Sequence, residues 1–307
     1  MEIPSFLSPV SLYSAYLRRC CTTYGLTSQS INIDDDETTI HFWGPTNNQN
    51  KQSLVLLHGF GPVCLWQWGP QIQFLSSLFN LYVPDLIFFG KSTTKSPERS
   101  ETFQAACVAK LMETLGVKKY SVVGTSYGGF VAYHMAKQWP ERVEKVVIAS
   151  SGVNMRRRDC EELVTERAKL ERIDELLLPE SGSQLRTLMG LVMYRKPNLV
   201  IPNFLLNDFV HKLYKEKRKE KQELLEGITL GRDDTVTISP LQQDVLLIWG
   251  EHDQIFPLEM GKELKQILGE KARLEVIKTA SHVPQLEHPS PFNNMVRGFL
   301  CGSSCPV

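Results

Sequence analysis

The chain has 307 residues, of which 42% are hydrophobic, and its 34 Lys and Arg balance its 34 Asp and Glu. This length suits one large core, or a core with an inserted domain, and the zero net charge gives no indication of nucleic acid as a partner. The seven cysteines are scattered without a C-x-x-C pair and no run of about 18 apolar residues is present, so we expect a reduced, cytoplasmic protein without a spanning helix.

Residues 1–30 are expected to form an N-terminal helical segment. The segment lacks a basic start, and Pro and Ser break its apolar run, so it is not expected to be a secretory signal. Apolar residues recur at helical spacing, namely Phe6, Val10, Tyr13 and Leu17. Two interpretations stay open: peripheral membrane contact, with Cys20 and Cys21 as candidate acylation sites, or packing on the body or over a pocket mouth. We favour packing.

Strands and helices are predicted to alternate from residue 31 onward. Short apolar or β-rich runs predict the strands, and longer amphipathic runs predict the helices. The expected strands are 31–33, 39–43, 53–57, 81–85, 120–123 and 143–149, and the expected helices lie near 67–79, 101–115 and 129–138. This alternation indicates a mostly parallel sheet with helices on both faces.

The alternation stops at about residue 155, where a polar, charged and helical pattern continues to residue 238. Strands resume at 244–250 and 272–277. We therefore expect an α/β core made of residues 31–154 and 239–307, with a helical cap inserted at 155–238. The interleaved Lys and Glu of 215–221 are expected to form a solvated helix face, with a lipid surface as the alternative.

The stretch at 122–132, VVGTSYGGFVA, joins a predicted strand to a predicted helix through a turn that contains Ser126. Gly and Ser are common turn residues, so the motif alone also fits an ordinary strand end. In a strand–turn–helix context, such a serine forms a nucleophile elbow and stands above the sheet at the N-terminus of the helix. Gly124 and Gly128 would remove side chains that collide in so tight a turn. We predict that Ser126 is a nucleophile.

A serine nucleophile needs a base, and the base needs an acid that orients it. In a parallel sheet these groups collect on the loops that follow the strands. Asp253 and His282 each follow one of the last two predicted strands, and Glu251 is a competing carboxylate. The strand that ends at Ala149 is followed by Ser-Ser-Gly, without an acid. We predict that Asp253 orients His282, and that His282 is the base for Ser126.

An oxyanion hole requires backbone N–H groups that face the developing negative charge. Tyr127, directly after the nucleophile, is expected to supply one of them. The loop His58-Gly59-Phe60-Gly61 follows an earlier strand, and Phe60 is the better candidate for the second N–H. The two glycines permit close approach of the backbone, and His58 is expected to organise the loop.

With these motifs placed, the chain resembles the α/β-hydrolase superfamily from about residue 31 to 300. The resemblance rests on residues 57–61, 84–86, 89–92, 124–129, 249–253 and 282–289. The elbow and the Trp-Gly-x-x-Asp-Gln turn are most similar to those of monoacylglycerol-lipase-type and carboxylesterase-type serine hydrolases. The resemblance implies an α/β-hydrolase fold with about eight mostly parallel strands, helices on both faces and an inserted helical cap, and no metal or cofactor.

One position departs from the pattern of this superfamily. Its members commonly read Asp-x-x-Gly-x-Gly-x-Ser after the third strand, and here Phe88 replaces the first glycine. Because this loop borders the pocket in related folds, we expect a bulkier and more apolar pocket mouth.

The resemblance implies cleavage of a small apolar ester through an acyl-Ser126 intermediate, since the branches with an aspartate nucleophile are excluded by the serine. Apolar residues of the insert indicate an apolar acyl or aromatic substrate. Two alternatives stay open. A carbon–carbon hydrolase of a vinylogous diketone is suggested by the Gly61-Pro62 step and Trp66, although Val283 stands where that group usually has a bulky aromatic. A small-molecule receptor with this fold would keep the triad and turn over slowly.

Overall fold

One sheet forms the centre of the computed structural model, which describes residues 8–34, 37–47, 50–196 and 201–302. Within these residues the sheet has nine strands: eight follow the order β1-β2-β4-β3-β6-β7-β8-β9, and β5 pairs with β2. Pairing is antiparallel where β2 meets its neighbours and parallel from β4 to β9. The strands are β1 (Leu26–Asp34), β2 (Thr38–Pro45), β3 (Ser53–Leu57), β4 (Asn80–Pro84), β5 (Thr93–Thr94), β6 (Tyr120–Thr125), β7 (Val143–Ala149), β8 (Asp244–Gly250) and β9 (Ala272–Ile277).

The predicted mostly parallel sheet is confirmed, with one strand more than the eight expected. The additional strand is the two-residue β5. At the N-terminal side, β1 begins at Leu26, so residues 26–30 are strand although helix was expected to residue 30. Leu26 pairs with Pro45 and the ladder continues to Asp34. The polar sequence between them conceals the strand, because an edge strand needs apolar residues on one face only.

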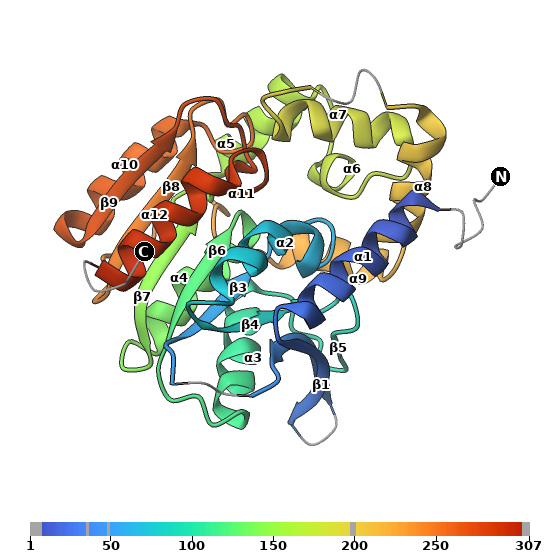
Figure 1. Ribbon diagram of the computed structural model, residues 1–307. Helices are drawn as coiled ribbons and strands as arrows, with labels where there is room; N and C mark the ends of the chain where they lie inside the picture. Colours follow the sequence, from blue (N-terminus) through green and yellow to red (C-terminus); the bar gives the residue numbers. More distant parts are fainter. Residues whose placement is uncertain (1–7, 35–36, 48–49, 197–200, 303–307) are drawn as a thin grey trace.

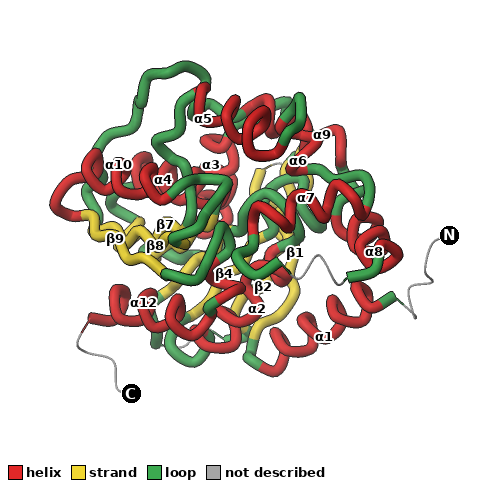
Figure 2. Tube along the Cα trace, turned by 90° about the horizontal axis from the view of Figure 1, so that it is seen from above, coloured by secondary structure: helices red, strands yellow, loops and turns green. Residues whose placement is uncertain are grey.

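Helices cover both faces of the sheet (Figures 1 and 2). On one face lie α1 (Pro9–Thr23), α2 (Cys64–Leu75) and α12 (Pro289–Cys301), which pack Leu17, Trp68 and Phe292 into one apolar core. On the other face lie α3 (Glu101–Thr114), α4 (Tyr127–Gln138) and α10 (Leu258–Leu268), which form a second core. The central strands contribute to both cores and are therefore apolar on both sides, as continuous runs such as Ser53–Leu57 indicate.

A group of short helices lies between β7 and β8 in the sequence and over the carboxyl ends of the strands (Figure 1). These are α5 (Arg157–Glu162), a π-helix (Leu163–Ala168), α6 (Ile173–Leu177), α7 (Gly182–Val192), α8 (Asn203–Leu213) and α9 (Arg218–Gly227). All of them except α5 contribute residues to an apolar core that also contacts Phe60 and Phe256 of the α/β body. This group, called the cap below, therefore roofs the edge at which the predicted site residues lie. A 3-10 turn (Gly269–Lys271) and α11 (Pro284–Glu287) complete the helices of the described residues.

The charged run at 215–221 is not the solvated helix face that we expected. Lys217 has a left-handed backbone conformation, with φ of 51°, that separates α8 from α9. Its Nζ donates to the carbonyls of Gly90 and Ser92 at 2.7 and 2.9 Å. Lys221 is only 4% exposed and lies over the ring of Phe89. Two lysines of this run therefore join the cap to the body instead of facing water.

The first helix packs on the body and the cap, as the favoured interpretation predicted. Ser8 caps α1 and donates its hydroxyl proton to Asp208 of α8 at 2.5 Å. The indole N–H of Trp66 in α2 donates to Ser14 at 3.0 Å. Cys21 is 2% exposed, and burial raises its pKa to about 12, so its thiol is not accessible for acylation. None of the helices built from the described residues has the length and hydropathy needed to cross a bilayer.

Candidate active site

Ser126 lies at the sharp turn between β6 and α4, as the sequence predicted. Its backbone has a φ of 52°, a conformation that non-glycine residues rarely adopt. A Cβ on Gly124 would lie 2.1 Å from the carbonyl oxygen of Gly128, and a Cβ on Gly128 would lie 2.2 Å from that of Leu57. Only glycine fits either position. The turn therefore presents the serine side chain above the sheet at the first turn of α4.

The structure brings the three predicted triad residues together. His282 Nε2 lies 3.0 Å from Ser126 Oγ, which is hydrogen-bonding distance. On the other side of the ring, Nδ1 lies 3.1 and 3.0 Å from the two carboxylate oxygens of Asp253. Asp253 Oδ1 also accepts the N–H groups of Ile255 and Phe256, at 2.8 and 2.9 Å. Because the carboxylate is fixed by the backbone, it can fix the orientation of the imidazole in turn.

The competing candidates lie in other environments. Glu251 is exposed, and its carboxylate lies 3.7 Å from the imidazole of His252. His58 is fully buried, accepts the N–H of Leu86 on Nε2 at 2.9 Å, and so donates from Nδ1 to Gly59 O at 2.8 Å. Burial lowers its pKa, which agrees with a neutral ring that organises the loop. Among the described residues, no group of three or more His, Cys, Asp or Glu is arranged to hold a metal ion.

The two predicted oxyanion donors flank the serine. Tyr127 begins α4, and Phe60 lies on the loop after β3, with the two rings in edge-to-face contact at 5.8 Å. Gly59 is the neighbour that approaches Ser126 closely, since a Cβ there would lie 3.0 Å from Ser126 Cβ. The N–H of Gly59 donates to Gln67 Oε1 at 2.8 Å and is therefore occupied. Within the described part of the chain, no acceptor is found for the N–H of Phe60 or Tyr127.

A cavity of about 360 Å³ is lined by Ser126 and by residues of both the cap and the body. Its walls come from α7, α8, the start of α1 and the loop around Phe60. Except for His282 beside Ser126, the described lining residues carry no ionisable side chain other than the phenol of Tyr214. Several apolar residues that the sequence assigned to the insert face into it: Leu185, Leu188, Met189, Met193, Leu205 and Phe209. We call this the apolar cavity.

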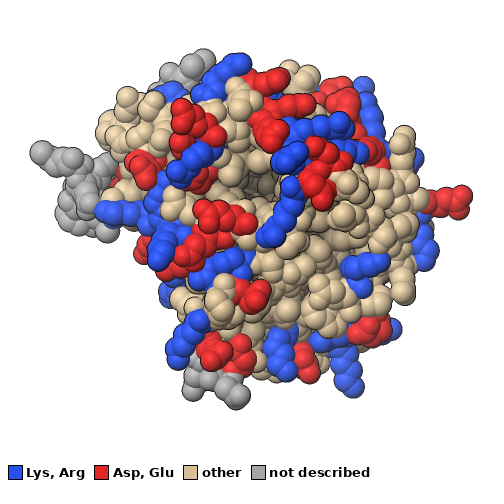
Figure 3. Space-filling view, turned by 180° about the vertical axis from the view of Figure 1, so that it is seen from behind, with Lys and Arg blue, Asp and Glu red and all other residues tan. Residues whose placement is uncertain are grey.

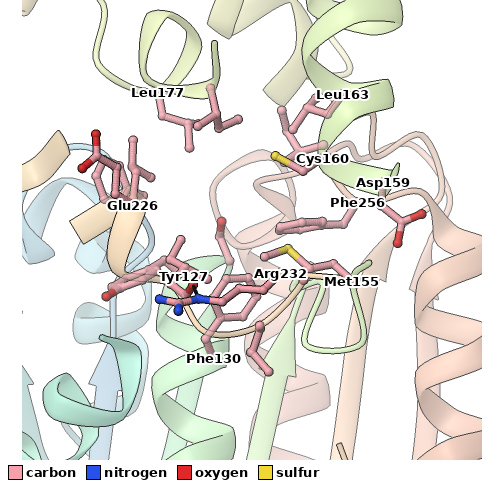
Figure 4. A pocket seen from close by; sticks show the side chains of 18 residues that line it. Tyr127, Phe130, Met155, Asp159, Cys160, Leu163, Leu177, Glu226, Arg232 and Phe256 are labelled. Carbon is pink, nitrogen blue, oxygen red and sulfur yellow. Dashed lines mark hydrogen bonds between the residues drawn. The ribbon is translucent and has the colours of Figure 1, made fainter. Parts of the chain in front are cut away.

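A second cavity of about 270 Å³ is also lined by Ser126 and shares Phe60, Leu177 and Ile255 with the apolar cavity. In Figure 4, Leu163 and Leu177 approach it from the cap, and Tyr127 and Phe130 lie on the body side. Three charged residues also line this cavity: Asp159, Glu226 and Arg232. On the rear face of the molecule, Figure 3 shows a hollow whose rim carries both positive and negative side chains. We call the cavity that these three charged residues line the charged cavity.

Phe88 does not form a pocket mouth, contrary to the expectation from the sequence. It lines neither cavity and is 5% exposed, and the Arg99 guanidinium lies 4.5 Å from the centre of its ring. Its φ of 70° explains why the superfamily usually has glycine here. With this backbone conformation, the side chain of Phe88 is part of the apolar core and not of a pocket mouth.

Two polar side chains that support the site were not predicted. Ser151 Oγ donates to the carbonyl oxygen of Ser126 at 2.6 Å and so holds the elbow from the neighbouring strand end. Gln67 bonds the backbone of the loop that carries Phe60. Ser151 binds a backbone atom that is remote in the sequence, and Gln67 binds a loop whose shape cannot be predicted from the sequence. Neither residue belongs to a recognisable motif. Only Ser151 had a usable signal, as a polar residue two positions after the end of β7.

The family model for the alpha/beta hydrolase fold matches residues 52–289. The chain belongs to the alpha/beta hydrolase family. A curated relative in this family, the 2-hydroxy-6-oxononadienedioate/2-hydroxy-6-oxononatrienedioate hydrolase of Burkholderia vietnamiensis strain G4, is 28% identical over 302 residues. The match covers 91% of this chain and 97% of the relative.

Two solved structures of alpha/beta hydrolases are also similar. A bacterial membrane phospholipase A superposes with a TM-score of 0.80 at 21% identity, covering 96% of this chain and 92% of that one. A 2-hydroxy-6-oxo-6-phenylhexa-2,4-dienoate hydrolase from Rhodococcus sp. strain RHA1 gives a TM-score of 0.71 at 24% identity, covering 89% and 97%. The predicted superfamily and fold are therefore confirmed. The name of the curated relative matches the alternative reaction and not the ester cleavage that we favoured.

Proposed function

We propose that this alpha/beta hydrolase is a serine hydrolase that cleaves carboxylic esters with an apolar acyl or aromatic group. The observation that carries the proposal is the apolar cavity, because Ser126 lines it and no Asp, Glu, Lys or Arg is found among its described lining residues. Its volume of about 360 Å³ lies in the range of ligand pockets, roughly 300–1,000 Å³. A neutral acyl chain gains from burial there, whereas an anionic group would lose its solvation without a partner.

The arrangement of the triad supports an acyl-transfer mechanism. Ser126 Oγ attacks the ester carbonyl while His282 Nε2, at 3.0 Å, accepts its proton. Asp253 stabilises the resulting imidazolium and keeps Nδ1 protonated. The negative oxygen of the tetrahedral intermediate accepts the N–H groups of Phe60 and Tyr127. The imidazolium then protonates the departing alcohol, and the acyl group stays on Ser126.

Deacylation repeats these steps with water as the nucleophile. His282 removes a proton from water, the hydroxide attacks the acyl-Ser126 carbonyl, and the serine leaves with the proton from His282. We assign the acyl chain to the apolar cavity and the departing alcohol to the charged cavity. The charged side chains of that cavity suit a hydroxylated or polar alcohol better than an alkyl chain.

Hydrolysis of p-nitrophenyl esters from acetyl to dodecanoyl tests the proposal. We expect kcat/KM to rise about two- to fourfold for each added methylene until the apolar cavity is filled, because each buried methylene contributes about 0.8 kcal/mol. Ser126→Ala is the matched control and should remove the turnover at every chain length. A folded wild-type protein without Ser126-dependent turnover would contradict the ester proposal.

Carbon–carbon hydrolysis is the second candidate, favoured by the name of the curated relative. The substrate in that name is a dioate, which carries two carboxylates. In the charged cavity, Arg232 is the only Lys or Arg among the described lining residues, and it shares the cavity with Asp159 and Glu226. The apolar cavity offers no cation among its described residues. Recognition of a dianion is therefore less well supported than recognition of a neutral ester.

A 2-hydroxy-6-oxo dienoate with a phenyl group at C6 distinguishes the two reactions. Cleavage destroys the conjugated system, so the loss of its absorbance reports turnover. If the wild type cleaves this compound with a kcat/KM above that of its best ester, the carbon–carbon reaction replaces our proposal. If it cleaves neither compound but binds one of them tightly, and Ser126→Ala binds equally well, the receptor alternative is supported.

A further inference from the structure

The oxyanion loop is held at its first residues by a buried histidine. This loop, residues 58–62, connects β3 to α2 and carries Phe60. His58 donates from Nδ1 to the carbonyl oxygen of Gly59 at 2.8 Å, and its other ring nitrogen accepts the N–H of Leu86. One side of the loop is thereby tied to the loop that follows β4. A single histidine, however, leaves the residues that follow Gly59 without an anchor.

Gln67, in the first turns of α2, supplies that anchor. Its Oε1 accepts the N–H of Gly59 at 2.8 Å, and its Nε2 donates to the carbonyl of the same residue at 3.0 Å. The same Nε2 also donates to the carbonyl oxygen of Pro62 at 2.6 Å. A primary amide has two N–H donors and one carbonyl acceptor, so both kinds of group are engaged by the loop. The side chain thus closes the loop across Phe60, with one contact point before it and one after it.

These contacts decide which N–H the loop can offer to a substrate. The N–H of Gly59 is used by Gln67, although Gly59 packs against Ser126. The N–H of Phe60 has no acceptor within the described residues, and Phe60 lines both cavities beside Ser126. Oxyanion stabilisation depends on donors that are held in place before the reaction begins. We propose that Gln67 is a positioning residue that fixes the Phe60 N–H for the oxyanion.

This inference rests on the proposed serine chemistry, but it does not depend on the ester as substrate. Gln67 also lines the apolar cavity, but its hydrogen bonds go to the loop backbone and none joins it to Ser126 or His282. Its loss should therefore weaken stabilisation of the transition state more than binding of the ground state, which separates kcat from KM. The His282–Asp253 pair is untouched, so the pH at which kcat/KM rises should not move.

The test compares Gln67→Met, Gln67→Glu and the control Gln73→Met. Met has nearly the length of Gln without its hydrogen bonds, whereas Glu keeps the acceptor for Gly59 N–H and loses both donors. Gln73 is exposed on the same helix and receives the same substitution. We expect Gln67→Met to lower kcat about 10- to 100-fold and to keep KM within about threefold of the wild type. This loss is smaller than the 10²- to 10³-fold fall in kcat that follows complete removal of an oxyanion-hole donor, because the Phe60 N–H remains but is less well positioned. Gln67→Glu should lose at least as much, and Gln73→Met should match the wild type.

A second readout is the rate at which a fluorophosphonate probe modifies Ser126. The serine oxygen forms a bond to phosphorus, fluoride leaves and His282 takes the proton, so the reaction needs the nucleophile and the oxyanion hole but no natural substrate. We expect this rate to fall with kcat in both Gln67 variants. If a folded Gln67→Met keeps kcat and the labelling rate within about twofold of the wild type, the inference is wrong. Should Gln67→Met fail to fold, an unchanged Gln67→Glu overturns it equally.

The two proposals can fail separately. A wild type that reacts with the probe but cleaves no ester refutes the ester proposal, and the Gln67 variants then still test positioning through the labelling rate. Conversely, normal ester turnover by a folded Gln67→Met leaves the ester proposal standing and removes the positioning role.

Discussion

Asp253 is fixed by the chain before it fixes His282. Its Oδ1 accepts two consecutive backbone N–H groups, from Ile255 and Phe256, and the same carboxylate meets His282 Nδ1. The side chain of Asp253 is fully buried. An acid held in this way has one orientation, so the imidazole has one as well. The proton of the ring then stays on Nδ1, and Nε2 is free to act as the base for Ser126.

Asp253→Asn should lower kcat about 10²- to 10⁴-fold while the protein remains folded. The amide is nearly isosteric with the acid, but it cannot stabilise the imidazolium, and its NH₂ group favours the wrong imidazole tautomer. Hydrolysis of the best p-nitrophenyl ester measures the loss. Glu251→Gln is the matched control, since Glu251 is the exposed carboxylate of the same turn, and it should keep normal kcat. A large loss in Glu251→Gln with near-normal Asp253→Asn would reverse the assignment of the acid.

The triad could be predicted because each member lies on the turn or loop that follows a strand, and the ends of these strands can be recognised in the sequence. Ser126, Asp253 and His282 needed only the alternation of elements and the chain order Ser–Asp–His. Gln67 could not be found in this way, because its partners are backbone atoms whose positions depend on the shape of the loop. Phe88 was misjudged for a related reason: the direction of a side chain at positive φ is set by packing and not by the residue type.

At the scale of elements, α9 joins the cap to the body through two lysines. Lys217 bonds the carbonyls of Gly90 and Ser92, and Lys221 lies with its Nζ 5.3 Å from the centre of the Phe89 ring. No ion pair to Lys221 is found among the described residues, and the attraction of the ring offsets only part of the cost of burying its charge. The contact therefore secures the position of α9 at an energetic cost.

Lys221→Met should stabilise the protein at neutral pH. Burial, with Lys217 nearby, lowers the pKa of Lys221 from its usual 10.5 to about 8. Below pH 8 the folded protein must bury a charged amine. Between pH 8 and 10.5 the unfolded chain still binds a proton that the folded protein has lost, so the wild type gains stability as pH rises. We expect Met to raise the free energy of unfolding at pH 7 by about 1–3 kcal/mol.

Urea unfolding at a series of pH values measures this effect. The advantage of Lys221→Met should shrink as the pH approaches 10.5, because the buried amine of the wild type is then neutral. Lys219→Met is the control, since its side chain is 87% exposed, and it should change stability by less than about 0.5 kcal/mol. A gain that stayed constant over the whole pH range would point to packing and not to the buried charge.

Elements of the core were predicted more closely than elements of the cap. Strands buried on both faces leave continuous apolar runs, and their positions in the sequence agree with the structure to within a few residues. In the cap, the helices are short and are separated by residues with a left-handed backbone conformation, such as Lys169 and Lys217. A lysine in the sequence does not indicate this conformation, so these helix ends could not be predicted. The burial of Lys221 could not be predicted from the sequence either. Interleaved charges indicate a solvated helix face when the surface against which the helix packs is unknown.

At the scale of the whole molecule, α1 closes the apolar cavity and leaves an apolar strip outside. Pro9 and Val10 line the cavity, while Leu12 and Tyr16, one helical turn apart, are 57% and 60% exposed. Their neighbour Tyr13 is 46% exposed. Helix α1 therefore lies between the proposed acyl site and the solvent. Packing of α1 on the body and contact of its outer face with a membrane are therefore compatible, although the sequence presented them as alternatives.

We expect the outer face of α1 to bind anionic lipid vesicles. Leu12 and Tyr16 would enter the interface, and the exposed Arg18 and Arg19 on the same helix would be attracted to anionic headgroups. Wild-type protein should co-sediment with vesicles of phosphatidylcholine and phosphatidylserine, less so at high salt because the charges are screened. The double variant Leu12→Glu/Tyr16→Glu should stay in the supernatant.

Thr22→Glu/Thr23→Glu provides the matched control, because both threonines are exposed on α1 and the variant adds the same charge without removing apolar surface. It should bind more weakly than the wild type but clearly better than Leu12→Glu/Tyr16→Glu. Both variants should hydrolyse a soluble p-nitrophenyl ester like the wild type, since the substituted residues line neither cavity. Equal sedimentation of the wild type and Leu12→Glu/Tyr16→Glu would show that this face does not contact lipid. Loss of ester hydrolysis in Leu12→Glu/Tyr16→Glu alone would show that the strip acts on the cavity wall, through the packing of α1, and not on a membrane.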